Sequence, residues 1–169
     1  TEHGIKELDG FCREEMRLPA ESLVRVPKEL GIHAVLVEPA SVVAKAWAHV
    51  EHIGRRAHWA PQRALVTGAG PVGLLAALLG RQRGLEVMVL DRVTDGAKPR
   101  LVRALGAMYT NGPIADLLAT SPPDIVMECT GAPSVVLEVM RHNAPGCITC
   151  LVGISAGGRP GPVDMGALN

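Results

Sequence analysis

The sequence contains few aromatic side chains and no excess of either charge. Phenylalanine, tryptophan and tyrosine together make up 2% of the residues, and 17 lysines and arginines are balanced by 17 aspartates and glutamates. Nucleic-acid binding needs a basic surface for the phosphates, and binding of single strands adds aromatic platforms for the bases. The composition therefore argues against nucleic acid as a partner.

Cysteines and long hydrophobic runs are also scarce. The four cysteines are scattered, no secretory signal precedes them, and the apolar runs are interrupted well short of a bilayer span. We therefore expect a protein of the reducing cytoplasm with no membrane partner. Cys147 and Cys150 have the CxxC spacing of a redox or metal motif, but they fall inside a predicted strand with no second pair, which favours burial in the core.

What the sequence does contain, from residue 63 on, is a regular alternation of strand-like and helix-like segments. The predicted strands are near-continuous apolar runs, which is typical of a parallel sheet covered by helices on both faces. The alternation predicts a doubly wound α/β fold of the Rossmann type. Strands are predicted at 63–67, 85–91, 107–110, 124–129 and 146–152, with helices at 71–83, 97–105, 113–120 and 132–143 between them.

The first part of the chain lacks this rhythm. Short β-like pieces and two prolines, Pro19 and Pro27, precede a long amphipathic helix expected at about 39–58. We therefore predict a division into a short N-terminal part, 1–37, and a dinucleotide-binding domain, 38–169.

A glycine-rich loop links the first predicted strand to the helix after it, in the stretch ALVTGAGPVGLLAALLG. Gly68 permits a tight turn, Gly70 lets the backbone approach a pyrophosphate, and Gly73 allows the helix to pack closely on the strand. Pro71 and Val72 open the helix, whose N-terminal N–H groups favour phosphate. A lone GxGxxG motif is weak, but here it has its full context of strand, turn, helix and a second strand ending in an acid.

That acid is Asp91. A carboxylate at this position can accept hydrogen bonds from the adenosine ribose and would repel a 2′-phosphate, so we expect NAD to be favoured. Arg92 follows directly and could pair with such a phosphate, which would leave NADP tolerated. Arg92 is equally well explained as a solvated surface charge.

Two further loops follow the ends of predicted strands, where open α/β sheets bind ligands. They contain Cys129, Thr130 and Gly131 in one case and Val152 and Gly153 in the other. Their small residues leave room for the nicotinamide and its ribose. Ordinary turns between strands and helices use the same residue types, so that interpretation stays open.

Several segments together carry a resemblance to a known family, and they run along nearly the whole chain in the family's order. The sequence resembles the glucose dehydrogenases of the medium-chain, zinc-dependent dehydrogenase superfamily. The segments are TEHGIKELDGFCREEM, LVRVPKELGIHAVLVEPASVVAKA, GAGPVGLLAALLGRQRGLEVMVLDR and ECTGAP.

The resemblance implies a GroES-like catalytic domain around a central nucleotide-binding domain. It implies a zinc ligand at Glu38, in the EP segment, and a contact from Glu2 to the hydroxyls of a sugar. The family's other zinc ligands and the sixth strand of its sheet have no counterpart in these 169 residues. The chain alone is therefore expected to be inactive and to correspond to part of a dimeric or tetrameric enzyme.

In such an enzyme, zinc polarises the substrate oxygen, and hydride passes from the anomeric carbon of the sugar to NAD or NADP. Two other functions share the glycine loop. One is an alcohol or polyol dehydrogenase of the same superfamily, and the other is an NAD(H)-sensing regulatory module without catalysis. Glu2 and Glu38 favour an enzyme over a sensor, although a lone Glu38 also fits a carboxylate that stabilises a helix N-terminus.

Overall fold

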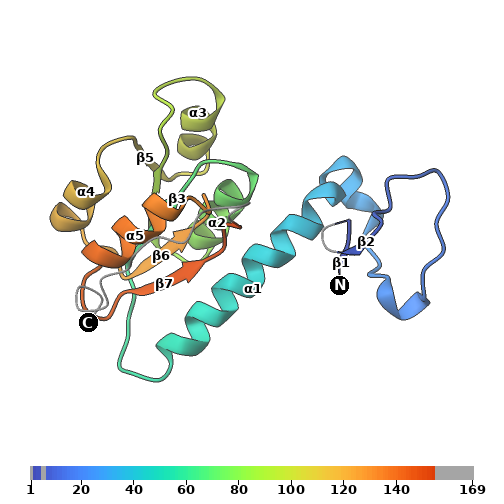
Figure 1. Cartoon of the computed structure of the whole chain (residues 1–169), viewed down its shortest axis with the longest axis horizontal. Coiled ribbons are helices and arrows are strands. Elements are labelled where there is room, and N and C mark those ends of the chain that lie inside the picture. The colour runs from blue at the N-terminus through green and yellow to red at the C-terminus, as the bar shows by residue number, and fades with distance from the viewer. Residues whose placement is uncertain (1, 5–6, 155–169) are drawn as a thin grey trace. The chain divides into compact units, whose positions relative to one another are not determined.

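The computed structural model describes residues 2–4 and 7–154. The chain divides into two compact units, one up to Val35 and one from Leu36 onward. The larger unit holds a sheet of five parallel strands in the order β5-β4-β3-β6-β7 (Figure 1). The strands are β3 (Arg63–Thr67), β4 (Glu86–Leu90), β5 (Met108–Thr110), β6 (Ile125–Glu128) and β7 (Ile148–Leu151).

The predicted doubly wound fold is confirmed by this strand order. β3 lies at the centre, and its Val66 is in register with Val89 of β4 on one side and Met127 of β6 on the other. The chain moves outward from β3 to β4 and β5, then returns to add β6 and β7 on the other side. This reversal creates a crevice at the carboxyl ends of β3 and β6, the usual ligand position in such sheets.

Helices cover both faces of the sheet. Side chains alternate along β3, so Val66 joins a core with helices on one face while Leu65 joins a second core on the other. The first core takes Val102 of α3 and several residues of α1 and α2, and the second takes Leu118 of α4 and Val139 of α5. These helices are α1 (Val37–Gly54), α2 (Pro71–Gln82), α3 (Ala97–Ala104), α4 (Ile114–Thr120) and α5 (Pro133–His142).

Helix α1 is longest, and the sequence prediction of its end at residue 58 is wrong. The helix ends at Gly54. The chain then turns so that the ring of Trp59 lies where a β-carbon on Gly54 would be, at 1.9 Å from its nearest atom. Glycine alone allows this contact, and nothing in the local periodicity predicts it. Trp47, on the buried face of α1, donates its indole N–H to the carbonyl of Ala76 in α2 at 3.2 Å.

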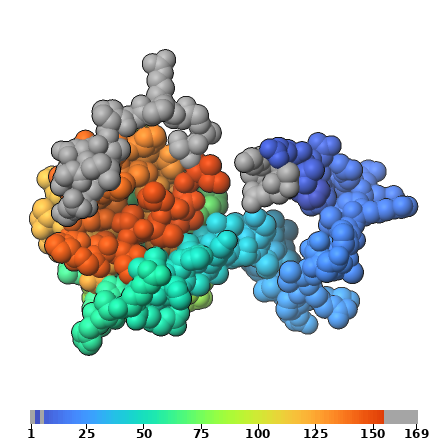
Figure 2. Space-filling model, turned by 60° about the horizontal axis from the view of Figure 1, so that its bottom comes forward, coloured from blue at the N-terminus to red at the C-terminus, as the bar shows by residue number. Residues whose placement is uncertain are grey.

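Among the described residues, one helical segment, Lys28–Gly54, is long and apolar enough to cross a membrane by length and composition alone. This differs from the expectation that every apolar run falls well short of a span. A single such helix is weak support for a membrane segment, because helices packed into a protein core pass the same test. Part of the segment does pack in this way, because α1 buries Val43 and Val50 and lies along β7. Figure 2 shows the cyan-green surface of the segment that contains α1 beside orange-red surface.

The smaller unit, up to Val35, has little regular structure in its described residues. β1 (Glu2–His3) and β2 (Glu7–Leu8) pair in parallel over two residues each. The short helix η1 (Ala20–Ser22) follows, and η2 (Lys28–Leu36) is kinked at Gly31 and leads into α1. None of the side chains described in this unit is buried.

Candidate functional site

The turn between β3 and α2 is built by its glycines. Gly68 has φ +89° and donates its N–H to the carbonyl of Leu90 at 2.7 Å, which ties the loop to the end of β4. A β-carbon on Gly73 would lie 1.8 Å from the carbonyl oxygen of Gly68, so glycine is required for α2 to approach the turn. By contrast, no heavy atom of the described residues lies within 4 Å of a β-carbon built on Gly70. The backbone at Gly70 is therefore open to a ligand.

Helix α2 begins at Pro71, directly beside that open backbone, and no side chain caps it. The first N–H groups of an α-helix have no acceptor within the helix, and at α2 they belong to Val72 and Gly73. Unpaired N–H groups and the positive end of the helix dipole together attract an anion. The loop thus has the shape and the donors that a pyrophosphate needs.

A cavity of about 590 Å³ opens beside this loop, at the carboxyl ends of the strands. Its size is within the range of cofactor sites. Its walls come from the ends of β3, β4 and β6, from residues after β5, and from the N-terminal parts of α3, α4 and α5. The lining residues include Gly68, Gly70, Asp91, Arg92, Lys98, Cys129 and Thr130.

Asp91 follows β4 and already has three hydrogen-bond donors. Its Oδ2 accepts bonds from the backbone N–H of Ala69 at 2.7 Å and from Nζ of Lys98 at 2.8 Å, and its Oδ1 accepts one from the backbone N–H of Val93 at 3.1 Å. Burial by itself raises the pKa of Asp91, but the hydrogen bonds from Lys98, Ala69 and Val93 outweigh it and hold the pKa below its usual value of 3.8. Asp91 is therefore an anion that fixes the glycine loop as well as facing the cavity.

Lys98 was not identified from the sequence. It lies in the first turn of α3, seven residues after Asp91, and its side chain is 42% exposed where it borders the cavity. Arg92 is exposed and borders the same cavity. A lysine at the start of the helix after the acid is the signal that sequence reasoning could have used. The cavity thus has two cations beside one aspartate at the end of β4.

The loops after β6 and β7 contact each other through their backbones. Gly131 has φ +64°, and a β-carbon there would lie 2.6 Å from the backbone of Ile154. A β-carbon on Gly153 would lie 2.2 Å from the backbone nitrogen of Gly131. The N–H groups of Val152 and Gly153 both donate to the carbonyl of Glu128 at 2.8 Å. The two loops predicted to border the nicotinamide are therefore brought together, and both lie next to Glu128.

Glu128 and Thr67 were also missed by sequence reasoning. Glu128 is 0% exposed and Thr67 is 1% exposed. They end the neighbouring strands β6 and β3, and Oγ1 of Thr67 donates to Oε1 of Glu128 at 3.1 Å. A charged residue that ends an otherwise apolar strand, within the quoted segment ECTGAP, was the available signal.

Three partly buried thiols, one of which lines the cavity, have raised pKa values. Burial, and then the nearby Glu128, raise the pKa of Cys129 to about 12. Burial likewise raises the pKa of Cys147 to about 11 and raises that of Cys150. The described part of the chain holds no group of three or more histidine, cysteine, aspartate or glutamate side chains that could bind a metal ion. Cys147 and Cys150 are half-buried and pack against the two cores.

Of the two residues singled out by the family resemblance, Glu38 does not line this cavity. Glu38 is exposed in the first turn of α1, where its carbonyl accepts a hydrogen bond from Oγ of Ser41 at 2.7 Å. Glu2 lies in β1, and its side chain is outside the described structure. The two residues belong to different compact units.

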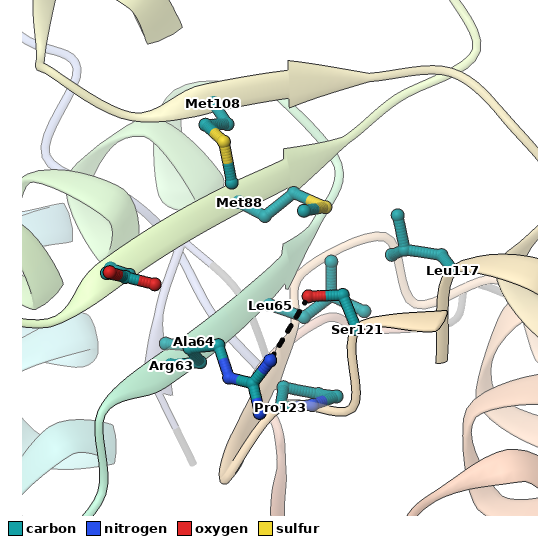
Figure 3. A pocket seen from close by; sticks show the side chains of 9 residues that line it. Arg63, Ala64, Leu65, Met88, Met108, Leu117, Ser121 and Pro123 are labelled. Carbon is teal, nitrogen blue, oxygen red and sulfur yellow. Dashed lines mark hydrogen bonds between the residues drawn. The ribbon is translucent and has the colours of Figure 1, made fainter. Parts of the chain in front are cut away.

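A second cavity lies near the opposite ends of the strands. It measures about 30 Å³ and is lined by residues that begin β3, β4 and β5, among them Arg63 and Met108 (Figure 3). Arg63 crosses it to donate from Nη1 to Oγ of Ser121 at 3.4 Å. This volume is enough for about one water molecule. It is too small for a nucleotide.

Comparison with known proteins agrees with this geometry. A family model described as the C-terminus of glucose dehydrogenase matches residues 31–169. Glucose 1-dehydrogenase 1 of Caldivirga maquilingensis is 41% identical over 156 residues, which cover 91% of this chain and 44% of that protein. Glucose 1-dehydrogenase of Thermoproteus tenax is 43% identical over 155 residues, covering 90% and 44% of the two chains. The chain spans less than half the length of these curated relatives.

Solved structures show the same relationship. Glucose dehydrogenase from Haloferax mediterranei superimposes with a TM-score of 0.88 at 27% identity, covering 99% of this chain and 49% of that one. The same enzyme in complex with NADP, Zn and gluconolactone gives a TM-score of 0.85 at 27% identity, covering 95% and 47%. Because the family model matches most of this chain, the chain belongs to the glucose dehydrogenase family. Its larger unit has the nucleotide-binding fold of that family.

Proposed function

We propose that this chain is the NAD(P)-binding part of a zinc-dependent glucose-type dehydrogenase. The observation that carries the proposal is the open backbone at Gly70, beside the N-terminus of α2 and the cavity of about 590 Å³. Membership of the glucose dehydrogenase family supports it independently. The reaction we propose for the whole protein is oxidation of a sugar at its anomeric carbon. A related alcohol is the alternative substrate.

The residues present fit a nicotinamide dinucleotide. The glycine loop would hold the pyrophosphate on the N–H groups of Val72 and Gly73, and Asp91 would face the adenosine ribose. The loops with Thr130 and Gly153 would border the nicotinamide and its ribose. When bound, the nicotinamide supplies a hydride acceptor, while the protein supplies binding and orientation.

Within this site we propose that NAD is favoured and NADP is tolerated. Oδ2 of Asp91 is engaged by Ala69 and Lys98, but Oδ1 has a single described donor, the N–H of Val93, and a carboxylate oxygen can accept another bond. That leaves an acceptor for a ribose hydroxyl. Lys98 and Arg92 line the same cavity and offer two cations to a 2′-phosphate, and NADP occupies the Haloferax relative.

Zinc is a different case. The described residues do not form a metal site by themselves, since the family ligand among them, Glu38, is exposed and belongs to no cluster of metal-binding side chains. We propose that Glu38 provides one zinc ligand, and Glu2 one sugar contact, when the rest of a catalytic domain is present. We also propose the division at residue 37, a cytoplasmic location, and assembly into dimers or tetramers, all by analogy with the family.

A graded pair of substitutions tests the cofactor site. Gly70→Ala places one carbon, and Gly70→Val three, in the open space where the pyrophosphate would lie. We expect NADH and NADPH binding, followed by dihydronicotinamide fluorescence, to weaken modestly in the first variant and by more than about tenfold in the second. Circular dichroism should show the same fold in both, because the space is otherwise free. Unchanged binding by a folded Gly70→Val chain would contradict the assignment.

A further inference from the structure

The buried carboxylate of Glu128, at the end of β6, accepts four hydrogen bonds from residues of β3 and of the loop after β6. Oε1 of Glu128 accepts bonds from Oγ1 of Thr67 at 3.1 Å and from the backbone N–H of Thr130 at 2.8 Å, and also accepts one from Oγ1 of Thr130. Oε2 accepts a bond from the backbone N–H of Gly131 at 3.1 Å. Glu128 is 0% exposed, and all of these donors are uncharged.

These bonds join the segments that surround the cofactor cavity. Thr67 directly precedes Gly68 of the pyrophosphate loop, while Thr130 and Gly131 form the loop after β6. The backbone carbonyl of Glu128 adds the N–H groups of the loop after β7. Glu128 therefore lies where the strand order reverses, between β3 and β6. Its hydrogen bonds link the pyrophosphate loop to both loops beside the nicotinamide.

A carboxylate is well suited to accept these four hydrogen bonds. A carboxylate has about four acceptor positions and no donor, so it can take every one of these N–H and O–H groups at once. A glutamine of the same shape would direct its NH₂ group at one of them. Burying a carboxylate without a cation is costly, and an apolar side chain would fill the same space without that cost. The arrangement therefore stabilises a particular loop geometry rather than the sheet.

Contacts between the loops show what that geometry is. A β-carbon on Gly68 would lie 3.0 Å from Cγ2 of Thr130, so a side chain at this position would press on the loop after β6. Oγ1 of Thr130 also accepts the N–H of Ala132 at 3.0 Å, which extends the network from Glu128 into the start of α5. Movement of the Thr130–Gly131 segment would therefore change the space between the loop after β6 and the glycine loop at Gly68.

We propose that Glu128 is a positioning residue that holds the Thr130–Gly131 segment where it receives the nicotinamide riboside half of the cofactor. The proposal rests on the proposed function, since it assigns that half of the dinucleotide to these loops. Without the carboxylate, the segment must be ordered when the cofactor binds, and this cost falls on the nicotinamide end. The pyrophosphate keeps its contacts, because they are made by the glycine loop and α2.

The experiment compares NADH with ADP-ribose, which contains the pyrophosphate and adenosine but no nicotinamide. Calorimetry measures both ligands on the 169-residue chain, and dihydronicotinamide fluorescence reports on NADH alone. We expect Glu128→Gln to weaken NADH by about tenfold and ADP-ribose by less than about twofold. Thr67→Val, which removes one donor and keeps the side-chain shape, should weaken NADH by about threefold, and Thr67→Ser should restore it.

Asp124 offers a matched control at the other end of β6. Its Oδ2 accepts the backbone N–H groups of Gln62 and Arg63 at 2.7 and 2.9 Å, so it also links β6 to β3 through a carboxylate. Asp124→Asn should lower the melting temperature without changing the ratio of the NADH and ADP-ribose affinities. A purely structural role for Glu128 would make the two variants behave alike.

The outcomes separate the inference from the proposed function. A selective loss of NADH affinity in Glu128→Gln, absent in Asp124→Asn, supports the positioning role. Equal loss of both ligands, or no loss, overturns it, and so does a wild-type chain that binds NADH no more tightly than ADP-ribose. If the wild-type chain binds neither ligand, the proposed function itself fails and the inference with it. Should Glu128→Gln fail to fold, the Thr67 pair decides by the same ratio.

Discussion

The two units of the chain differ in how their structure is stabilised. From Leu36 onward, the sheet and its helices bury two clusters of apolar side chains, with Trp47, Val66 and Met127 among the fully buried residues. Up to Val35, no described side chain is buried, and large apolar residues such as Val24 and Ile32 are more than 80% exposed. A short segment without a core is not expected to be stable alone. We therefore expect the second unit to fold by itself. The first unit should need packing contacts from outside its own residues to be stable.

The same substitution, glycine to alanine, should have very different effects in the two units. Gly73→Ala puts a β-carbon 1.8 Å from the carbonyl of Gly68, whereas Gly31→Ala meets no heavy atom of the described residues within 4 Å, although φ is +49°. We expect the first change to destabilise the fold by about 3 kcal/mol or more, because backbone must move to relieve the clash. The second should leave the cooperative melting transition unchanged. Urea unfolding followed by circular dichroism measures both.

Either of two results would contradict the comparison. An equal destabilisation by Gly31→Ala would show that the first unit shares the cooperative core of the second. An unchanged midpoint for Gly73→Ala would show that the glycine loop adapts more easily than its close packing indicates.

The same difference explains how much of the structure the sequence could predict. The strand and helix pattern after residue 62 depends on local apolar runs and turn glycines, so β3 was predicted to the residue, and so was the doubly wound parallel fold class. The end of α1 was predicted wrongly because it depends on Trp59 packing over Gly54, a contact made by the folded chain. In the first unit no described residue is buried, so there is no apolar periodicity from which helices and strands could be predicted.

The candidate site divides along similar lines. Gly68, Gly70 and Gly73 were assigned their roles from their spacing and from the predicted strand, helix and acid around them, and the close approach at Gly73 agrees with its role. Lys98 and Glu128 were missed because their roles appear when separate segments meet: Lys98 with Asp91, and Glu128 with Thr67. Hydrogen bonds between segments carry no periodicity, so sequence reading could locate the loops but not the residues that hold them.

Within the second unit, Lys98 distinguishes cofactor recognition from folding. Lys98→Met removes a cation from the cavity, so NADPH should bind about tenfold more weakly while NADH changes by less than about threefold. Lys98→Arg should retain NADPH binding. Lys45→Met makes the same charge change on an exposed position of α1 that does not line the cavity, and it should leave both affinities unchanged. Loss of both cofactors alike in Lys98→Met would show that Lys98 acts only through the position of Asp91.

The same variant has a defined pH dependence. Because the folded-state pKa of Asp91 lies below its usual value of 3.8, its contribution to stability is present above that value and is lost as the pH falls through the folded-state pKa. Burial alone would raise that pKa, and the hydrogen bond from Lys98 is the largest effect that lowers it. Lys98→Met should therefore begin to lose stability at a higher pH than wild type. Melting temperatures between about pH 2 and 6 measure the shift.

The smallest expected effect leaves the fold unchanged and compares thiols in the two units. Cys12 is exposed in the first unit, while Cys129 in the second has a pKa raised to about 12 by burial and the nearby Glu128. At pH 8, Cys129 is then almost entirely a thiol, whereas the thiolate is the form that reacts with alkylating reagents. Iodoacetamide should label Cys12 in the native chain within minutes and Cys129 only after urea unfolding, as mass spectrometry of peptides can resolve. Rapid labelling of Cys129 in the native chain would show that the loop after β6 opens readily, and it would weaken both the comparison between the units and the fixed position inferred for that loop.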